Sequence, residues 1–214
     1  MKNKNTRIWA YIFGIIPIIV LACVYTHLPE QVPMHWGING EVEYSAKWQV
    51  WMPFSLGVIL AILFDVLPKI DPKRKNYEKF GQYYDLFVIV MLVFLMIMDG
   101  IILLESFLPG TISVGKVVFI LIGILFAILG NIMPKIKTNF YMGIRTPWAL
   151  TNSDVWNKTQ RLAGKMMFVV GLISIVSGML LSEFVCFVIM MISVACMTIV
   201  PLVMSYVWYR KLEK

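Results

Sequence analysis

Long apolar runs alternate with short polar connections along the whole chain of 214 residues. A helix needs about 20 mostly apolar residues to cross the hydrocarbon core of a bilayer. The expected spans are 8–26, 50–67, 84–104, 113–133, 166–181 and 184–208. The last two form a helical hairpin around Ser182 and Glu183, because together they are about twice as long as one crossing. The pattern therefore predicts an all-α, polytopic membrane bundle of six transmembrane helices.

Lysine and arginine are concentrated on one side of this arrangement. The two terminal tails and the connections 68–83 and 134–165 hold 17 of the 19 basic residues. Cytoplasmic loops of membrane proteins are enriched in these residues, so we expect both termini and both connections in the cytoplasm (N-in/C-in). The expected location is the cell membrane, with the connection 27–49 outside.

Composition agrees with this class of protein. Apolar residues make up 59% of the chain and charged residues 14%, against about 25% charged residues in an average soluble domain. The net charge of +7 follows from topology, and basic residues divided among four short segments do not form the patch of a nucleic-acid reader. We expect no direct nucleic-acid partner, whereas membrane lipids with anionic headgroups attract such segments.

Residues that carry catalysis or bind metals are sparse. The chain has two histidines and three cysteines, without a Cys-x-x-Cys pair or a glycine-rich phosphate loop. We therefore expect no metal, no other cofactor and no enzymatic activity. Asp65 and Asp99 lie inside spans, which makes them candidate functional groups, but both are near the span ends and are expected to be hydrated.

The outer connection 27–49 predicts a β-hairpin. Residues 38–40 suit a three-residue turn with Gly40 in the left-handed region. The facing pairs are then Trp36 and Val42, His35 and Glu43, and Met34 and Tyr44. One face is apolar and packs on the outer helix ends, while His35 and Glu43 form a polar pair on the other. The hairpin either caps the bundle or contacts a ligand.

The inner connection 134–165 contains the sequence GIRTPW. Gly143 permits a turn, Pro147 favours extended backbone before it, and Trp148 suits the lipid headgroup level. These neighbours hold Arg145 at the interface, where its guanidinium can bind a phosphate or a carboxylate with two hydrogen bonds. Arg145 therefore either anchors the segment to lipid or binds an acidic partner.

An inner amphipathic helix is predicted after this sequence, with Thr151 and Asp154 as a capping box. Its apolar face comprises Val155, Thr159, Leu162 and Met166, and its basic face Lys158, Arg161 and Lys165. We expect it to lie on the inner leaflet before it turns into the fifth span. Alternatively, it is a docking surface for a cytoplasmic protein.

Small residues predict where the spans approach one another closely. Gly171, Ser174 and Gly178 share one face of the fifth span, and Gly57 and Ala61 share one face of the second. We read both stripes as assembly features.

Both long connections resemble the SdpI family of bacterial membrane proteins. The segment GNIMPKIKTNFYMGIRTPWALTNSDVWNKTQRLAGK from Gly130 is similar to the family signature: GN, a later N, G-I/L-R-T-P-W-T/A-L, V-W and R-x-x-G/S-K. The outer stretch LPEQVPMHWGINGEVEYSAKW is similar to the small module that precedes this signature in the family. We expect a two-span module over residues 1–83 and a four-span SdpI-like module over residues 84–214.

The resemblance implies immunity to a secreted antimicrobial peptide toxin and signal transduction, in which a small cytoplasmic repressor is held at the membrane once toxin is sensed. The inner motif positions are Asn131, Asn139, Gly143, Arg145, Thr146, Pro147, Trp148, Trp156 and Arg161. The outer ligand loop comprises Pro33, His35, Trp36 and Gly40, joined by Glu43 as the expected partner of His35.

A second interpretation is a small transporter or a membrane-embedded enzyme acting on lipid or peptide. It would use His35, Glu43 and Asp99 at the outer face. General acid–base groups must lie within hydrogen-bond reach of one another, and no spacing in this sequence guarantees that.

Overall fold

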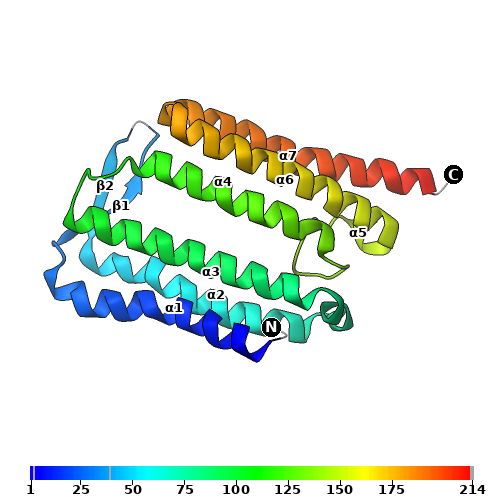
Figure 1. Ribbon diagram of the computed structural model, residues 1–214, viewed down its shortest axis with the longest axis horizontal. Helices are drawn as coiled ribbons and strands as arrows, with labels where there is room; N and C mark the ends of the chain where they lie inside the picture. Colours follow the sequence, from blue (N-terminus) through cyan, green and yellow to red (C-terminus); the bar gives the residue numbers. More distant parts are fainter. Residues whose placement is uncertain (2, 39, 213–214) are drawn as a thin grey trace.

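The structure, a computed structural model, describes residues 1, 3–38 and 40–212. Its long helices are α1 (Lys4–Val24), α2 (Trp51–Ile70), α3 (Tyr77–Phe107), α4 (Val114–Ile132), α6 (Ser153–Leu180) and α7 (Glu183–Leu212). These six helices are long and apolar enough to cross a membrane, and they run along the long axis of the molecule (Figure 1). The predicted six-helix bundle is confirmed. Lys2 and Lys214, which entered the predicted orientation, and Asn39 of the predicted turn lie outside the described residues.

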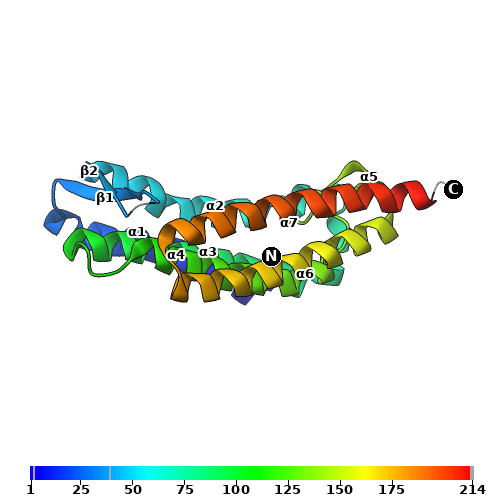
Figure 2. The same cartoon turned by 90° about the horizontal axis from the view of Figure 1, so that it is seen from above.

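The short elements lie at the two ends of an elongated molecule (Figure 2). One end carries the hairpin of β1 (Gln31–Trp36) and β2 (Val42–Ala46), with the 3-10 turns η1 (Tyr25–His27) and η2 (Lys47–Val50). The opposite end carries η3 (Arg74–Asn76), η4 (Met133–Lys135) and α5 (Pro147–Thr151). Both termini point to this second end (Figure 1). We call the hairpin end outer and the opposite end inner, in agreement with the predicted orientation.

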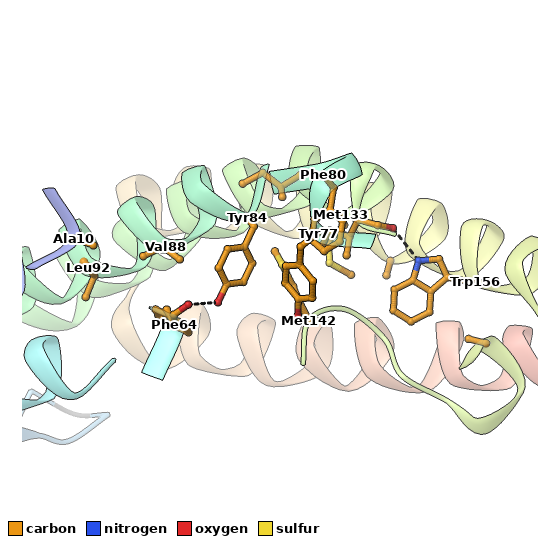
Figure 3. Close-up of a cluster of buried hydrophobic side chains, with 14 of the residues drawn as sticks. Ala10, Phe64, Tyr77, Phe80, Tyr84, Val88, Leu92, Met133, Met142 and Trp156 are labelled. Atoms are coloured by element: carbon orange, nitrogen blue, oxygen red, sulfur yellow. Dashed lines mark hydrogen bonds between the residues drawn. The ribbon is translucent and has the colours of Figure 1, made fainter. Parts of the chain in front are cut away.

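Aromatic residues fill the core where α1, α2 and α3 meet. The buried side chains include Ala10 of α1, Ala61 and Phe64 of α2, and Phe80, Tyr84, Val88 and Leu92 of α3. The Tyr84 hydroxyl donates a hydrogen bond of 2.7 Å to the Phe64 carbonyl (Figure 3). Burying a hydroxyl without a partner is unfavourable, so this bond allows a polar ring to lie in an apolar core.

Helices α4 and α6 are in contact through glycines spaced seven residues apart. These are Gly123 and Gly130 on α4, and Gly164, Gly171 and Gly178 on α6. A methyl group on Gly164 would lie 2.6 Å from the Gly130 carbonyl oxygen, far inside an ordinary contact of about 3.5–4.0 Å. The predicted close packing is confirmed at Gly171 and Gly178, whereas the Ser174 hydroxyl lies beside α7.

A second close approach joins α1 and α2. A methyl group on Gly14 would lie 3.0 Å from the carbonyl of Gly57, and Ala61 one turn away is fully buried. The small-residue face predicted for the second span is therefore confirmed.

Residues 153–180 form one uninterrupted helix, so the prediction of a separate helix on the inner leaflet is wrong. The apolar face of the segment packs on the protein, where Val155 and Trp156 are buried. The predicted capping box is also wrong. The side chain of Asn152 caps α6, because it accepts hydrogen bonds of 2.8 and 3.1 Å from the N–H groups of Asp154 and Val155.

Asp65 and Asp99 are buried, so the expectation that they are hydrated is wrong. Only 7% of Asp65 and 4% of Asp99 is exposed. The Asp65 carboxylate lies 2.9 Å from Nε of Arg7 in α1 and 2.8 Å from Nζ of Lys69 in its own helix, so the pair with Arg7 connects α1 to α2. One carboxylate oxygen of Asp99 is buried without a hydrogen-bond partner in the described part of the chain.

Candidate functional site

The two inner connections are joined through the buried carboxylate of Asp71, which directly follows α2. One oxygen accepts hydrogen bonds of 3.0 Å from the Tyr77 hydroxyl and from the Phe140 N–H group. The other accepts a bond of 2.7 Å from the N–H group of Lys73. Hydrogen bonds to a charged acceptor are stronger than neutral ones, so Asp71 fixes the segment after α4 against the segment after α2.

Asn139 shapes the turn that Asp71 contacts. It is fully buried, and its side-chain oxygen accepts hydrogen bonds of 2.9 and 2.6 Å from the N–H groups of Tyr141 and Met142. Its amide nitrogen donates bonds of 2.9 and 3.1 Å to the carbonyls of Lys137 and Met142. The amide thus uses all four of its hydrogen-bonding positions.

Gln160 of α6 holds the next residues of the connection. Its side chain accepts a bond of 3.0 Å from the Ile144 N–H group and donates one of 2.9 Å to the Ile144 carbonyl. Gly143 has φ of +99°, and a methyl group there would lie 2.7 Å from the Gln160 oxygen. The Trp156 indole donates a bond of 2.8 Å to the Ile136 carbonyl (Figure 3). We call Asp71, Tyr77, Asn139, Gly143, Trp156 and Gln160 the inner clasp.

The Thr-Pro-Trp part of the motif builds the short helix α5. The Thr146 hydroxyl oxygen accepts a bond of 3.2 Å from the Ala149 N–H group, and Pro147 occupies the first helical position, where a missing N–H group has no cost. The Trp148 ring packs on Tyr206 of α7, with ring centroids 5.0 Å apart. The motif therefore connects the clasp to the last helix.

Arg145 is exposed on the surface of the clasp. Its guanidinium donates a hydrogen bond to the Phe140 carbonyl. The ammonium group of Lys73 lies 5.6 Å from the centre of the Phe140 ring and donates a bond of 3.0 Å to the Leu150 carbonyl. Two cations thus flank one exposed loop, and a planar guanidinium is well suited to carboxylate or phosphate.

Two inner motif positions lie apart from the clasp. Asn131 is exposed and donates a bond of 2.8 Å to the Ala127 carbonyl of its own helix, and Arg161 is exposed on α6. Sequence reasoning missed Asp71, Tyr77 and Gln160. A signal was present for Gln160 alone, because it is a polar residue one helical turn after Trp156 on an apolar face.

The outer hairpin has most of the predicted register. The pairs predicted correctly are Trp36 with Val42 and His35 with Glu43. Gly40 has the expected positive φ, +80°. The predicted pair of Met34 with Tyr44 is wrong, because a β-bulge places Pro33 opposite Tyr44. Tyr44 is exposed, so it does not belong to the packed apolar face that was predicted.

A groove of about 430 Å³ lies between the hairpin and the outer ends of α3, α4 and α7. Its apolar lining includes Met34, Trp36, Met98, Ile101, Val118 and Phe187. Its charged or polar groups include His35 and Glu183, and the Glu183 carboxylate accepts a hydrogen bond from the Ser113 hydroxyl. The predicted outer residues His35 and Trp36 therefore line a groove that helices far along the chain complete.

These features define a multi-pass protein of the cell membrane with one structured site at each end of a six-helix bundle. Residues 135–205 match the SdpI/YfhL protein family, and residues 12–58 match a Domain of unknown function (DUF1648). The chain is also 28% identical to Immunity protein SdpI of Bacillus subtilis (strain 168) over 214 residues, or 100% of this chain and 99% of that protein. No solved structure matches it. The matches confirm the resemblance to the SdpI family that the motifs predict.

The matched regions include the hairpin and most of the inner clasp. Asp71 and Tyr77 lie between the two matches, although they bond directly to residues of the SdpI/YfhL region. The division into modules 1–83 and 84–214 stays a prediction.

Proposed function

We propose that this chain is a membrane immunity protein that protects against a secreted peptide toxin. The observation that carries the proposal is the similarity to an immunity protein over the full length of both chains. The outer groove supports it, because a toxin that arrives from outside meets the hairpin end first.

The proposal includes a second activity, in which the inner clasp reports the toxin to a small cytoplasmic repressor. Helix α3 supports this relay, since Met98 and Ile101 line the outer groove and Tyr77 belongs to the clasp. Its 31 residues are kinked at Phe80 (φ −129°, ψ 15°) and correspond to at most about 46 Å at 1.5 Å per residue. A relay also requires that the toxin binds one of two helix packings more tightly than the other.

Two cations on the surface of the inner clasp, exposed Arg145 and half-buried Lys73, favour an acidic partner. Arg145 and Lys73 come from different connections, and both contact Phe140, so a carboxylate on the repressor would gain two charge-assisted bonds. A lipid phosphate offers the same chemistry, and the experiment below separates the two.

The test of immunity is survival of a toxin-sensitive bacterium that expresses wild type, Arg145→Ala or the exposed control Lys158→Ala at matched membrane abundance. We expect protection by wild type and by Lys158→Ala. Loss of protection in Arg145→Ala alone would place Arg145 in immunity, and protection by all three would assign it to anchoring or signalling. No protection by any of them would contradict the proposal.

The relay is tested by crosslinking in the same cells with and without toxin. We expect a small DNA-binding protein to be captured only with toxin, and to be lost in Arg145→Ala while the membrane abundance of the variant is unchanged. Absence of such capture in every condition would refute the relay and leave immunity standing.

A transporter or enzyme is the second candidate, and one observation favours it: the buried, unpaired oxygen of Asp99 is typical of functional groups in membranes. His35 and Glu43 pair on the exposed hairpin instead, and no hydrogen bond joins them to Asp99 within the described ranges. Full protection by His35→Ala, Glu43→Gln and Asp99→Asn, each tested alone, would remove this candidate.

A further inference from the structure

The groove at the outer end is built from parts that are distant in sequence. The hairpin forms its roof, while α3, α4 and α7 form its walls. Glu183 at the start of α7 lies close to the hairpin turn, because its carboxylate would be 3.8 Å from a methyl group on Gly40. The hairpin therefore extends across the bundle to the last helix and covers the groove.

The size and lining of the groove suit apolar side chains. Its volume of about 430 Å³ falls within the range of about 300–1,000 Å³ that is usual for ligand pockets. Trp36 from the roof and Phe119 and Phe187 from the walls offer aromatic surface. Large aromatic side chains contribute strongly to recognition when they are covered by a ligand.

The charge at this end favours a cationic ligand. The outer end carries five glutamates and two lysines: Glu30, Glu41, Glu43, Glu105 and Glu183, with Lys47 and Lys116. Lys47 is paired with Glu30 at 3.3 Å, and Glu105 is buried with bonds to two backbone N–H groups. Exposed Glu41 and Glu43 on the hairpin, half-buried Glu183 on α7 and half-buried Lys116 on α4 remain at this end, so the carboxylates outnumber the cation. Such a surface attracts positive charge, and the attraction falls with ionic strength.

We propose that the groove beneath the hairpin binds an amphipathic cationic peptide, with its apolar side chains between α3, α4 and α7 and its basic side chains toward the glutamates. The proposal rests on the proposed function only for the source of the peptide, which would be the toxin. The binding chemistry itself follows from the groove.

The experiment measures binding of a fluorescein-labelled helical peptide of leucine and lysine to the full chain in phosphatidylcholine nanodiscs, by fluorescence anisotropy. An equally long peptide of leucine and glutamate tests the charge, and empty nanodiscs give the background. Val118→Trp fills the groove from α4, while Val169→Trp places the same side chain on an exposed position of α6. Thermal melting checks that each variant is folded.

We expect the leucine–lysine peptide to bind wild type and Val169→Trp equally, and Val118→Trp at least about tenfold more weakly. If Val118→Trp does not fold, the doubly substituted Glu41→Gln/Glu43→Gln carries the test, because both side chains are exposed. In that variant we expect weaker binding and a smaller salt dependence. Equal binding by Val118→Trp and Val169→Trp, an unchanged salt dependence in the double variant, or equal binding of the two peptides would overturn the proposal.

The outcome is separate from that of the survival test. A chain that protects cells but binds the probe equally well with and without a filled groove retains the immunity function and loses this site. A chain that binds the probe in the groove but protects no cell retains the site and loses the immunity function.

Discussion

The close contact of α4 and α6 predicts a specific loss of stability on Gly164→Ala. The added methyl group would lie 2.6 Å from the Gly130 carbonyl oxygen and 2.9 Å from Cδ of Pro134. Reaching an ordinary contact of about 3.5 Å requires the helices to separate by about 0.9 Å. Overpacking of this kind costs about 1–3 kcal/mol. A chain of this size loses about 2–4 °C of melting temperature per kcal/mol, so we expect a decrease of about 2–12 °C.

The same displacement is expected to weaken the inner clasp. Trp156 lies on α6 two turns before Gly164, and its bond to the Ile136 carbonyl is 2.8 Å long. If the shift is fully transmitted, this distance grows to about 3.7 Å, beyond a hydrogen bond. Trypsin should then cleave the inner connection faster, for example at Arg145.

The assay is thermal melting of the detergent-solubilised chain, followed by size-exclusion chromatography of a fluorescent fusion. Gly100→Ala is the matched control, because a methyl group there meets nothing within 4 Å and alanine favours a helix over glycine by about 1 kcal/mol. We expect that control to melt at or above the wild-type temperature. A Gly164→Ala variant that melts together with Gly100→Ala would refute the reasoning.

Two further substitutions test polar and backbone features of the inner end. Gly143→Ala combines a positive φ with a clash and is expected to cost about 1–3 kcal/mol. Gln160→Ala removes the clashing side chain but also two hydrogen bonds, so its own melting temperature is the reference for the double variant. In that background Gly143→Ala should cost less than in wild type, and no cost at all would contradict the role of φ. Asp65→Asn leaves the partly exposed Arg7 and Lys69 and the buried ammonium group of Met1 without their counter-charge and should cost about 1–3 kcal/mol. The same melting assay with the exposed control Asp154→Asn checks this, and equal values for the two would show that the ion pairs contribute little.

The spans were predictable because apolar length reports the thickness of the bilayer. Their inner ends were not, since α3 begins at Tyr77 and α6 at Ser153, well before the apolar runs begin. Hydropathy detects where lipid contact ends, whereas a helix continues as long as its backbone bonds and protein contacts continue. The amphipathic face around Trp156 therefore indicated contact with protein rather than with lipid.

Only part of the inner clasp could be predicted from the sequence, for a related reason. Asn139, Gly143 and Trp156 belong to one continuous motif, so local sequence identifies them. Asp71 and Tyr77 act on residues more than 60 positions away, and one sequence contains no signal for such pairing. The β-bulge at Met34 was missed because simple alternation assumes an unbroken register.

The glycines of α4 and α6 could have been found earlier. Gly123 and Gly130 on one span and Gly164 and Gly171 on the other repeat every seven residues, which is the period of helices that stay in contact over several turns. The stripe predicted for the fifth span alone contained only Gly171 and Gly178 of this set.

The continuity of α6 also constrains how this protein can evolve. Gln160 and Trp156 at one end and Gly178 at the other must all face α4 or the segment that follows it. One inserted or deleted residue between them would rotate one end by about 100° relative to the other and shift it by about 1.5 Å. Sequence drift within this segment is therefore restricted to substitutions, and the segment keeps its length.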